Sequence, residues 1–143
     1  MAGIVLAADS TTVVLNGTVI ADLIEGSSVV LTPANPATAH INSTNGGVNI
    51  NERSDRGVHD LELLVQRFSE SDSFMNNLLR QSPPELVNGS VKESFNRDGI
   101  GGVESYILEL GSATAQPANT KNSTDGNAEQ KYTFRFRNVS RNL

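Results

Sequence analysis

Residues 131–137 read Lys-Tyr-Thr-Phe-Arg-Phe-Arg, so an aromatic residue stands at every second position. Successive side chains of a β-strand point to opposite faces of its sheet. This spacing therefore places Tyr132, Phe134 and Phe136 on one face, toward a hydrophobic core, and leaves the basic side chains on the other. The stretch predicts a half-buried strand and makes a β-rich fold the first expectation for the chain.

Two turn motifs predict hairpins upstream of this strand. Asn16-Gly17 separates the runs 11–16 and 18–23, and Asn45-Gly46-Gly47 separates 40–44 from 48–53. A type I′ turn needs a positive φ at both central residues, which Asn and Gly tolerate best. Other apolar or alternating runs predict further strands at 27–32, 60–68, 90–96 and 103–110.

One helix is expected, over residues 70–81. Ser69-Glu-Ser-Asp72 has the form of a capping box, apolar pairs follow at a spacing of four, and Pro83-Pro84 would end the helix. Residues 60–68 carry apolar side chains on both faces, which indicates a strand buried between two layers, with a helix as the alternative.

These elements predict a single domain over residues 1–143. Seven or eight strands and one short α-helix give a mainly β fold, an antiparallel β-sandwich or barrel of two packed sheets with the helix against it. Residues 111–130 are rich in Ser, Thr, Asn, Ala and Gly. We expect them to form a long loop or a hairpin arm.

Composition excludes several classes of protein. The chain has 143 residues, no cysteine and a formal net charge of −5. Without cysteine there are no disulfides, zinc–thiolate sites or thiol nucleophiles, and an acidic chain is a poor nucleic-acid binder. The first residues lack the basic start of a signal peptide, and no run approaches the ~20 apolar residues that span a bilayer. We expect no membrane insertion.

His59 and Asp60, with Asp55 nearby, could form an acid–base pair or a metal corner. Neighbouring residues of a strand point to opposite faces, so the pair is badly placed to share a ligand or a proton. We therefore predict a structural or exposed histidine, and no catalytic, cofactor-binding or metal-binding residue. A small hydrolase using this pair is the weakest reading.

Charge is distributed unevenly along the chain. Residues 1–52 carry four acidic residues and no basic one, a net of −4, whereas residues 131–143 carry four basic residues and no acidic one, a net of +4. Such patches arise by chance in small domains, but opposite poles also suit head-to-tail stacking of copies. The candidate contacts between stacked copies are Asp9, Asp22, Glu25, Lys131, Arg135, Arg137 and Arg141.

Several short motifs stand out along the chain. They are VLNG (14–17), EGS (25–27), PANPAT (33–38), NGGVNI (45–50), RSDRGVHD (53–60) and VQRFSESD (65–72). Together these motifs resemble the tail tube proteins of contractile-tailed bacteriophages. The likeness covers roughly residues 13–96, and the strand at 134–138 fits in place.

The resemblance implies a structural virion protein rather than an enzyme, with no cofactor. Copies would form hexameric rings that stack into the inner tail tube, with sheath, baseplate and tape-measure proteins as partners. The protein would be assembled in the host cytoplasm and reside in the phage tail. The genome would pass through the bore without specific binding, which an acidic wall favours. The candidate lumen-facing acids are Glu52, Glu62, Glu93 and Glu109.

A binding module from another class stays open at this stage. A monomeric β-sandwich of a phage fibre or adhesin could bind carbohydrate or a receptor. Stacking on a sugar needs exposed aromatic side chains, and the chain has two Tyr and no Trp, which counts against this reading.

Overall fold

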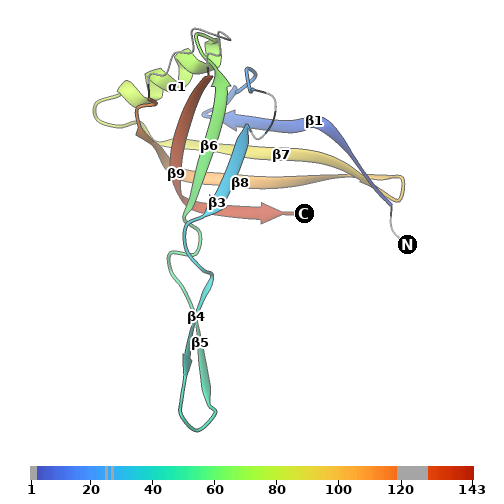
Figure 1. The fold of residues 1–143 in the computed structure, drawn as a ribbon, viewed down its shortest axis with the longest axis vertical. Coiled ribbons are helices and arrows are strands. Elements are labelled where there is room, and N and C mark those ends of the chain that lie inside the picture. The colour runs from blue at the N-terminus through green and yellow to red at the C-terminus, as the bar shows by residue number, and fades with distance from the viewer. Residues whose placement is uncertain (1–2, 25, 27, 119–128) are drawn as a thin grey trace.

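Figure 1 shows the computed structural model, which describes residues 3–24, 26, 28–118 and 129–143, without the side chains of 5–10. Within these residues one helix and nine strands form. They are β1 (Ile4–Leu15), β2 (Thr18–Val19), β3 (Val29–Pro33), β4 (Thr38–Asn42), β5 (Val48–Glu52), β6 (His59–Gln66), α1 (Glu70–Arg80), β7 (Val87–Arg97), β8 (Ile100–Ala115) and β9 (Glu129–Asn142).

Seven strands form one antiparallel sheet in the order β2-β1-β7-β8-β9-β6-β3. The start of β9 pairs with β6 and its end pairs with β8, so β9 belongs to both halves of the sheet. Figure 1 shows the sheet folded at β9, with β3 and β6 crossing over β1, β7 and β8. The predicted arrangement of two packed antiparallel layers with one helix is confirmed, and the layers are continuous through β9.

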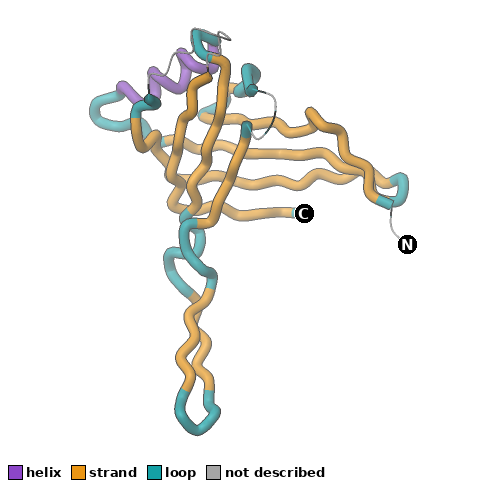
Figure 2. The backbone as a smooth tube through the Cα atoms, in the orientation of Figure 1, coloured by secondary structure: helices purple, strands orange, loops and turns teal. Residues whose placement is uncertain are grey.

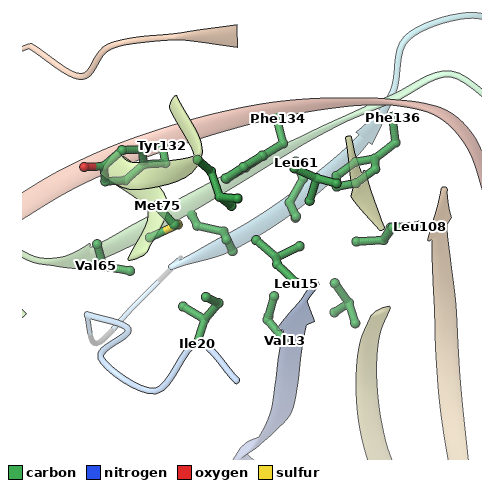
Figure 3. Close-up of a cluster of buried hydrophobic side chains, with 14 of the residues drawn as sticks. Val13, Leu15, Ile20, Leu61, Val65, Met75, Leu108, Tyr132, Phe134 and Phe136 are labelled. Atoms are coloured by element: carbon green, nitrogen blue, oxygen red, sulfur yellow. The ribbon is translucent and has the colours of Figure 1, made fainter. Parts of the chain in front are cut away.

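The core lies between these two layers (Figure 3). The aromatic face predicted for residues 131–137 is confirmed, because Tyr132, Phe134 and Phe136 are all buried. The opposing layer contributes Val13, Leu15, Val87, Val91 and Leu108. Phe136 lies across Gly111 of β8, where a Cβ would meet the aromatic ring at 2.3 Å, so this pairing requires glycine.

Helix α1 covers one end of the core with Met75 and Leu78. The Oγ of Ser69 accepts a hydrogen bond from the backbone N of Asp72 at 3.2 Å, which confirms the predicted N-cap. The helix ends one residue earlier than predicted, at Arg80. Residues 59–66 form the strand β6, so the helical alternative for this stretch is wrong.

The first hairpin has the predicted turn but a shorter second strand. Asn16 and Gly17 have φ values of 49° and 80°, as a type I′ turn requires. Only residues 18–19 pair as a strand, and Leu23 makes an isolated bridge to Val65. The chain leaves the sheet there to pass near α1, where Ala21 N donates to Ser71 Oγ.

Strand β8 is longer than predicted and contains a bulge. Regular alternation would place Leu110 on the same face as the buried Leu108, but Leu110 is 53% exposed and has a φ of 56°. The register with β7 shifts at this point, which moves Leu110 out of the alternation and brings Gly111 under Phe136. The expected loop 111–130 is strand at both ends, and residues 119–128 lie outside the described part.

The second predicted hairpin is confirmed but lies outside the sandwich. β4 and β5 form a separate two-stranded sheet, and β4 begins at Thr38, two residues before the predicted start of the strand. Figure 2 shows this hairpin projecting from the body on two loop segments. We call residues 38–52 the arm. It lies at the opposite end of β6 from α1.

Candidate self-assembly surfaces

The core-facing side of the long strands continues beyond the layer that covers it. Val91 of β7 is buried, but farther along the same face lie Glu93 and Phe95, which pair with Glu104 and Gly102 of β8. Two open grooves lie on this face. One, of about 220 Å³, is bordered by β3, and the other, of about 350 Å³, includes Ile4, Phe95 and Leu143. We call the lining of the larger groove the overhang: Ile4, Glu93, Phe95, Arg97, Glu104, Arg141 and Leu143.

The two ends of the seven-stranded sheet are open β-edges within the described residues. β2 pairs only with Val14 and Leu15, so most of β1 has no strand on that side. β3 is the other edge. Leu64 N donates to Ser28 O at 2.9 Å, and the antiparallel alternation then directs the backbone groups of Val29 and Leu31 to the open side. An open edge without charged side chains is ready to pair with another chain.

The arm presents apolar side chains to solvent. Ile41, Val48 and Ile50 are 61%, 58% and 58% exposed, and every residue of the two arm strands is exposed. Val48 and Ile50 share one face of the hairpin, since they pair with Asn42 and His40. An isolated two-stranded hairpin is only marginally stable in water, so such an arm gains most from contact with another surface.

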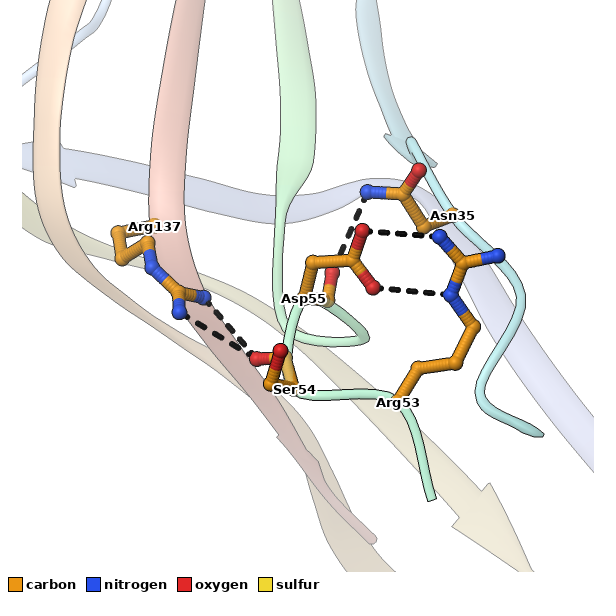
Figure 4. Close-up of polar contacts among 5 residues, drawn as sticks. All are labelled: Asn35, Arg53, Ser54, Asp55 and Arg137. Atoms are coloured by element: carbon orange, nitrogen blue, oxygen red, sulfur yellow. Dashed lines mark hydrogen bonds and ion pairs between the residues drawn. The ribbon is translucent and has the colours of Figure 1, made fainter. Parts of the chain in front are cut away.

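Polar contacts fix the base of the arm (Figure 4). Arg53 Nε and an Arg53 terminal nitrogen each lie 3.0 Å from the carboxylate of Asp55, and this guanidinium lowers the pKa of Asp55. Asn35 Nδ2 donates to Asp55 O at 3.3 Å, and Arg137 donates to Ser54 O at 3.3 Å. These contacts join both loop segments of the arm to β9, so the direction of the arm is set by the body.

The basic residues of β9 that are predicted to contact another ring all bind groups of their own chain. Arg135 Nε lies 2.8 Å from Asp60 Oδ1, and its hydrogen bonds lower the pKa of Asp60. Lys131 Nζ lies 3.4 Å from Glu62 Oε2, and Arg141 binds Glu104. Their role between rings stays a prediction. A contact with another copy would have to share or replace these partners within the chain.

Of the three acidic residues predicted to contact another ring, Asp22 is the one whose side chain is described. Asp22 Oδ2 accepts from Ser71 N at 3.3 Å, at the start of α1. Glu25 and the side chain of Asp9 lie outside the described part. A contact between an acidic and a basic pole stays a prediction.

The four candidate lumen acids lie on different surfaces. Glu52 is at the base of the arm, 3.1 Å from Arg56. Glu62 lies on the side of β6 opposite the buried Leu61 and Leu63. Glu93 belongs to the overhang, while Glu109 lies on the other face of the long strands. No single acidic surface of the subunit contains all four, and their placement in a bore stays a prediction.

The contacts of His59 and Asp60 are those of structural residues. Its Nδ1 lies 2.9 Å from Gly57 O, and both carboxylate oxygens of Asp60 bind Arg135. The described residues contain no group of three His, Asp or Glu side chains placed to hold a metal ion, and none of their helices has the length and apolar character needed to cross a membrane.

Sequence reasoning missed the overhang and the exposed apolar face of the arm. The overhang could not be read from alternation, because Phe95 follows the same pattern as the buried Val91. A signal for the arm was present, since residues 38–51 contain apolar residues and no Asp, Glu, Lys or Arg. Such a stretch is unusual for a fully solvated hairpin.

Neither a protein-family model nor a curated protein sequence matches the chain. Two solved structures are similar over most of its length. A chain of the anti-feeding prophage cap, the tube-terminating cap, has a TM-score of 0.68 at 13% identity, covering 96% of this chain and 91% of that one. A chain of the sheath–tube complex of the extracellular contractile injection system PVC has a TM-score of 0.63 at 12% identity, with the same coverage. The chain therefore has the fold of tube and cap components of contractile injection systems.

Proposed function

We propose that the protein is a structural subunit that assembles with copies of itself into the tube of a contractile tail or injection system. The observation that carries the proposal is the overhang, the uncovered continuation of the core-facing side of the long strands, which is bordered by the open edge of β1. A second copy that pairs at this edge would extend the sheet and cover the exposed face in one step. The shared fold with tube and cap components supports this role.

The finer form of the proposal is a hexameric ring that stacks into a hollow phage tail tube. The arm projects far enough from the sandwich to contact a copy in a different plane from the sheet edges (Figure 2). One set of contacts would then close the ring and the other would stack rings. A net charge of −5 per copy disfavours adhesion of a passing genome.

The same proposal defines the partners and the location. A tube inside a contractile tail would contact a sheath around it, a baseplate at one end and a tape-measure protein within. Its location would be the tail of the assembled particle, after synthesis and assembly in the host cytoplasm. The similarity to a chain of a sheath–tube complex supports the sheath contact.

A terminating cap is a second candidate, favoured by the higher TM-score of 0.68 to the anti-feeding prophage cap. A cap needs one stacking surface rather than two. Copies of a cap would therefore form rings that do not extend into tubes when no other protein is present.

The carbohydrate-binding alternative finds little support. Of the five Phe and two Tyr side chains, only Phe68 is exposed. A sugar platform uses several aromatic rings on one surface, or an aromatic ring beside a polar cleft. A hydrolase based on His59 and Asp60 lacks a free carboxylate, because Arg135 occupies Asp60.

Sedimentation velocity over a range of protein concentrations tests self-assembly. The proposal predicts that the 15.3 kDa subunit gives way to discrete larger species as concentration rises. A subunit that stays monomeric at every concentration and salt condition contradicts the proposal.

A further inference from the structure

The tip of the arm contains Asn45-Gly46, one of three Asn-Gly pairs in the chain; the others are Asn16-Gly17 and Asn88-Gly89. We propose that Asn45 is a site of spontaneous deamidation in the folded subunit, while Asn16 and Asn88 are protected. Deamidation converts a neutral amide into a carboxylate without an enzyme, so the fold alone determines which of the three sites reacts.

The arm turn brings the reacting groups of Asn45 together. Asn45 Oδ1 accepts a hydrogen bond from Ser43 Oγ at 2.5 Å and lies 3.5 Å from Gly47 N. A side-chain oxygen that turns back toward the amide two residues on folds the Asn45 side chain over the intervening Gly46 peptide, whose nitrogen is the attacking atom of the reaction. Ser43 Oγ also lies 3.1 Å from Gly47 O, and its one proton can be donated to either acceptor. When the proton is donated to Asn45, it polarises the amide C=O and makes its carbon more electrophilic.

Access to the turn is unobstructed. Gly46 has a φ of 88°, and a Cβ built on it would meet no atom within 4 Å. Ser43, Asn45 and Gly46 are all exposed. The backbone N of Gly46 has one hydrogen bond, a long one of 3.2 Å to Ser43 O, so it is readily released for reaction.

The reaction balances without a cofactor. A base removes the proton of Gly46 N, this nitrogen attacks the side-chain amide carbon of Asn45, and a new C–N bond closes a five-membered succinimide. The bond from that carbon to Nδ2 breaks, and Nδ2 leaves as ammonia after gaining a proton. Water then opens the ring at either carbonyl, which gives aspartate or isoaspartate.

The other two Asn side chains are anchored away from the following glycine. Asn16 Oδ1 accepts from Asn88 N at 2.9 Å, and Asn16 Nδ2 donates to Leu86 O at 3.2 Å. Asn88 Oδ1 accepts from Leu110 N at 2.9 Å, and Gly89 is paired with Leu15 inside the sheet. A Cβ on Gly89 would lie 2.0 Å from Val14 O, so this peptide has no room to be approached.

Deamidation changes the electrostatics of the arm. Residues 38–51 contain no Asp, Glu, Lys or Arg, so the new carboxylate is the first full negative charge on this stretch. Any contact that the arm tip makes with another surface is then altered with the age of the subunit. The inference concerns the free subunit and holds whether or not the arm contacts a second copy.

Peptide mapping by mass spectrometry, with fragmentation that distinguishes isoaspartate, tests the site. The full-length protein is incubated at mildly alkaline pH, both folded and in denaturant. In the folded protein we expect conversion at Asn45 at least about tenfold faster than at Asn16 or Asn88, since their anchoring hydrogen bonds must break first. In denaturant, all three Asn-Gly sites should react at similar rates.

Variants give the matched controls. Asn45→Gln should abolish the acidic species that accumulates on isoelectric focusing, Ser43→Ala should slow its formation, and Ser43→Thr should restore it. Equal rates at the three sites of the folded protein, or faster conversion at Asn16 or Asn88, overturn the proposal. An unchanged rate in Ser43→Ala overturns the positioning role of Ser43.

Discussion

Asp72 makes hydrogen bonds with three parts of the fold. Its Oδ2 accepts from Phe68 N at 2.9 Å, its Oδ1 accepts from Tyr132 Oη at 2.6 Å, and its own backbone N donates to Ser69. Burial, with the neighbouring carboxylate, raises the pKa of Tyr132. The contact ties the start of α1 to the aromatic face of β9, and it holds Phe68 at a φ of 67° that a bulky residue rarely adopts.

Replacing Tyr132 with Phe tests this contact. The ring still fills the core, but Asp72 loses its phenolic donor, and a hydrogen bond to a charged group contributes about 1.5–3 kcal/mol. Urea unfolding should show a loss of stability in this range. Ser73→Ala, an exposed change on the same helix, should be near neutral. Equal stability of Tyr132→Phe and the wild type contradicts a stabilising role.

Two arginine–carboxylate contacts should make the stability of the folded protein sensitive to acid. Hydrogen bonds from Arg53 and Arg135 lower the pKa values of Asp55 and Asp60 in the folded chain. A carboxyl with a depressed folded pKa contributes stability at pH values above its unfolded pKa, about 3.9, and loses that contribution as the pH falls through the lower folded value.

Melting temperatures measured from neutral pH down to about pH 2 check this prediction. The wild type should lose stability below about pH 4, and Asp55→Asn/Asp60→Asn should lose less over the same interval because part of the titrating stability is already absent. Glu85→Gln, at an exposed position outside these contacts, is the control. Identical pH profiles for the double variant and the wild type contradict the assignment.

At the scale of elements, the arm is expected to serve assembly rather than folding. Val48→Ser/Ile50→Ser removes two exposed apolar side chains from one face of the arm. Covering each of them would contribute about 1.5–3 kcal/mol. The variant should therefore melt like the wild type but need at least about tenfold more protein to assemble.

Asn49→Ser/Asn51→Ser changes the other face of the same strand and is the matched control. Light scattering against protein concentration gives the threshold for each protein. An assembly threshold unchanged in Val48→Ser/Ile50→Ser removes this face of the arm from the interface. A lowered melting temperature in that variant contradicts the view that the arm is independent of the core.

Assembly should also be sensitive to charged residues on the edge strand β3. Val30→Lys/Thr32→Lys places two charges on the open edge, where charged residues oppose pairing between sheets. Ser94→Lys/Asn96→Lys places the same charges on exposed positions of β7, which has strands on both sides. Gel filtration should show smaller assemblies for the β3 variant alone. Smaller assemblies for the β7 variant alone would place the interface on the face of the long strands.

Local elements could be predicted from the sequence because their causes are local. The alternation at 131–137, the Asn-Gly turns and the Ser69 cap each depend on a few neighbouring residues, and all of them occur in the structure. The bulge at Leu110 could not be predicted in this way. It coincides with a shift of register against β7 and with the packing of Phe136 against Gly111, and both of these contacts involve residues of other strands.

The candidate surfaces were less predictable for the same reason. The sequence indicated which charges could form poles, but Arg135, Lys131 and Arg141 find partners on other strands of their own chain. The overhang exists because β3 is short and the long strands extend past it, which is a matter of relative strand length and register. No spacing of residues within one strand contains that information.

At the scale of the whole molecule, the long strands of the sandwich extend past the layer that covers them. One end of its core is covered by α1, while the other continues into the overhang. The open edge of β1 borders the overhang, β3 borders the smaller groove, and the arm projects from the end of β6 that is far from α1 (Figure 1). The central claim is that copies of the chain complete one another around a channel.

Negative-stain electron microscopy of the purified protein at high concentration tests this claim most directly. The account predicts rings of uniform diameter with a central hole, and stacks of such rings in the form of hollow tubes. The edge variant Val30→Lys/Thr32→Lys, imaged under the same conditions, should lack them. A field of single compact particles of about the subunit mass of 15.3 kDa, with neither rings nor tubes at any salt concentration, would contradict the account.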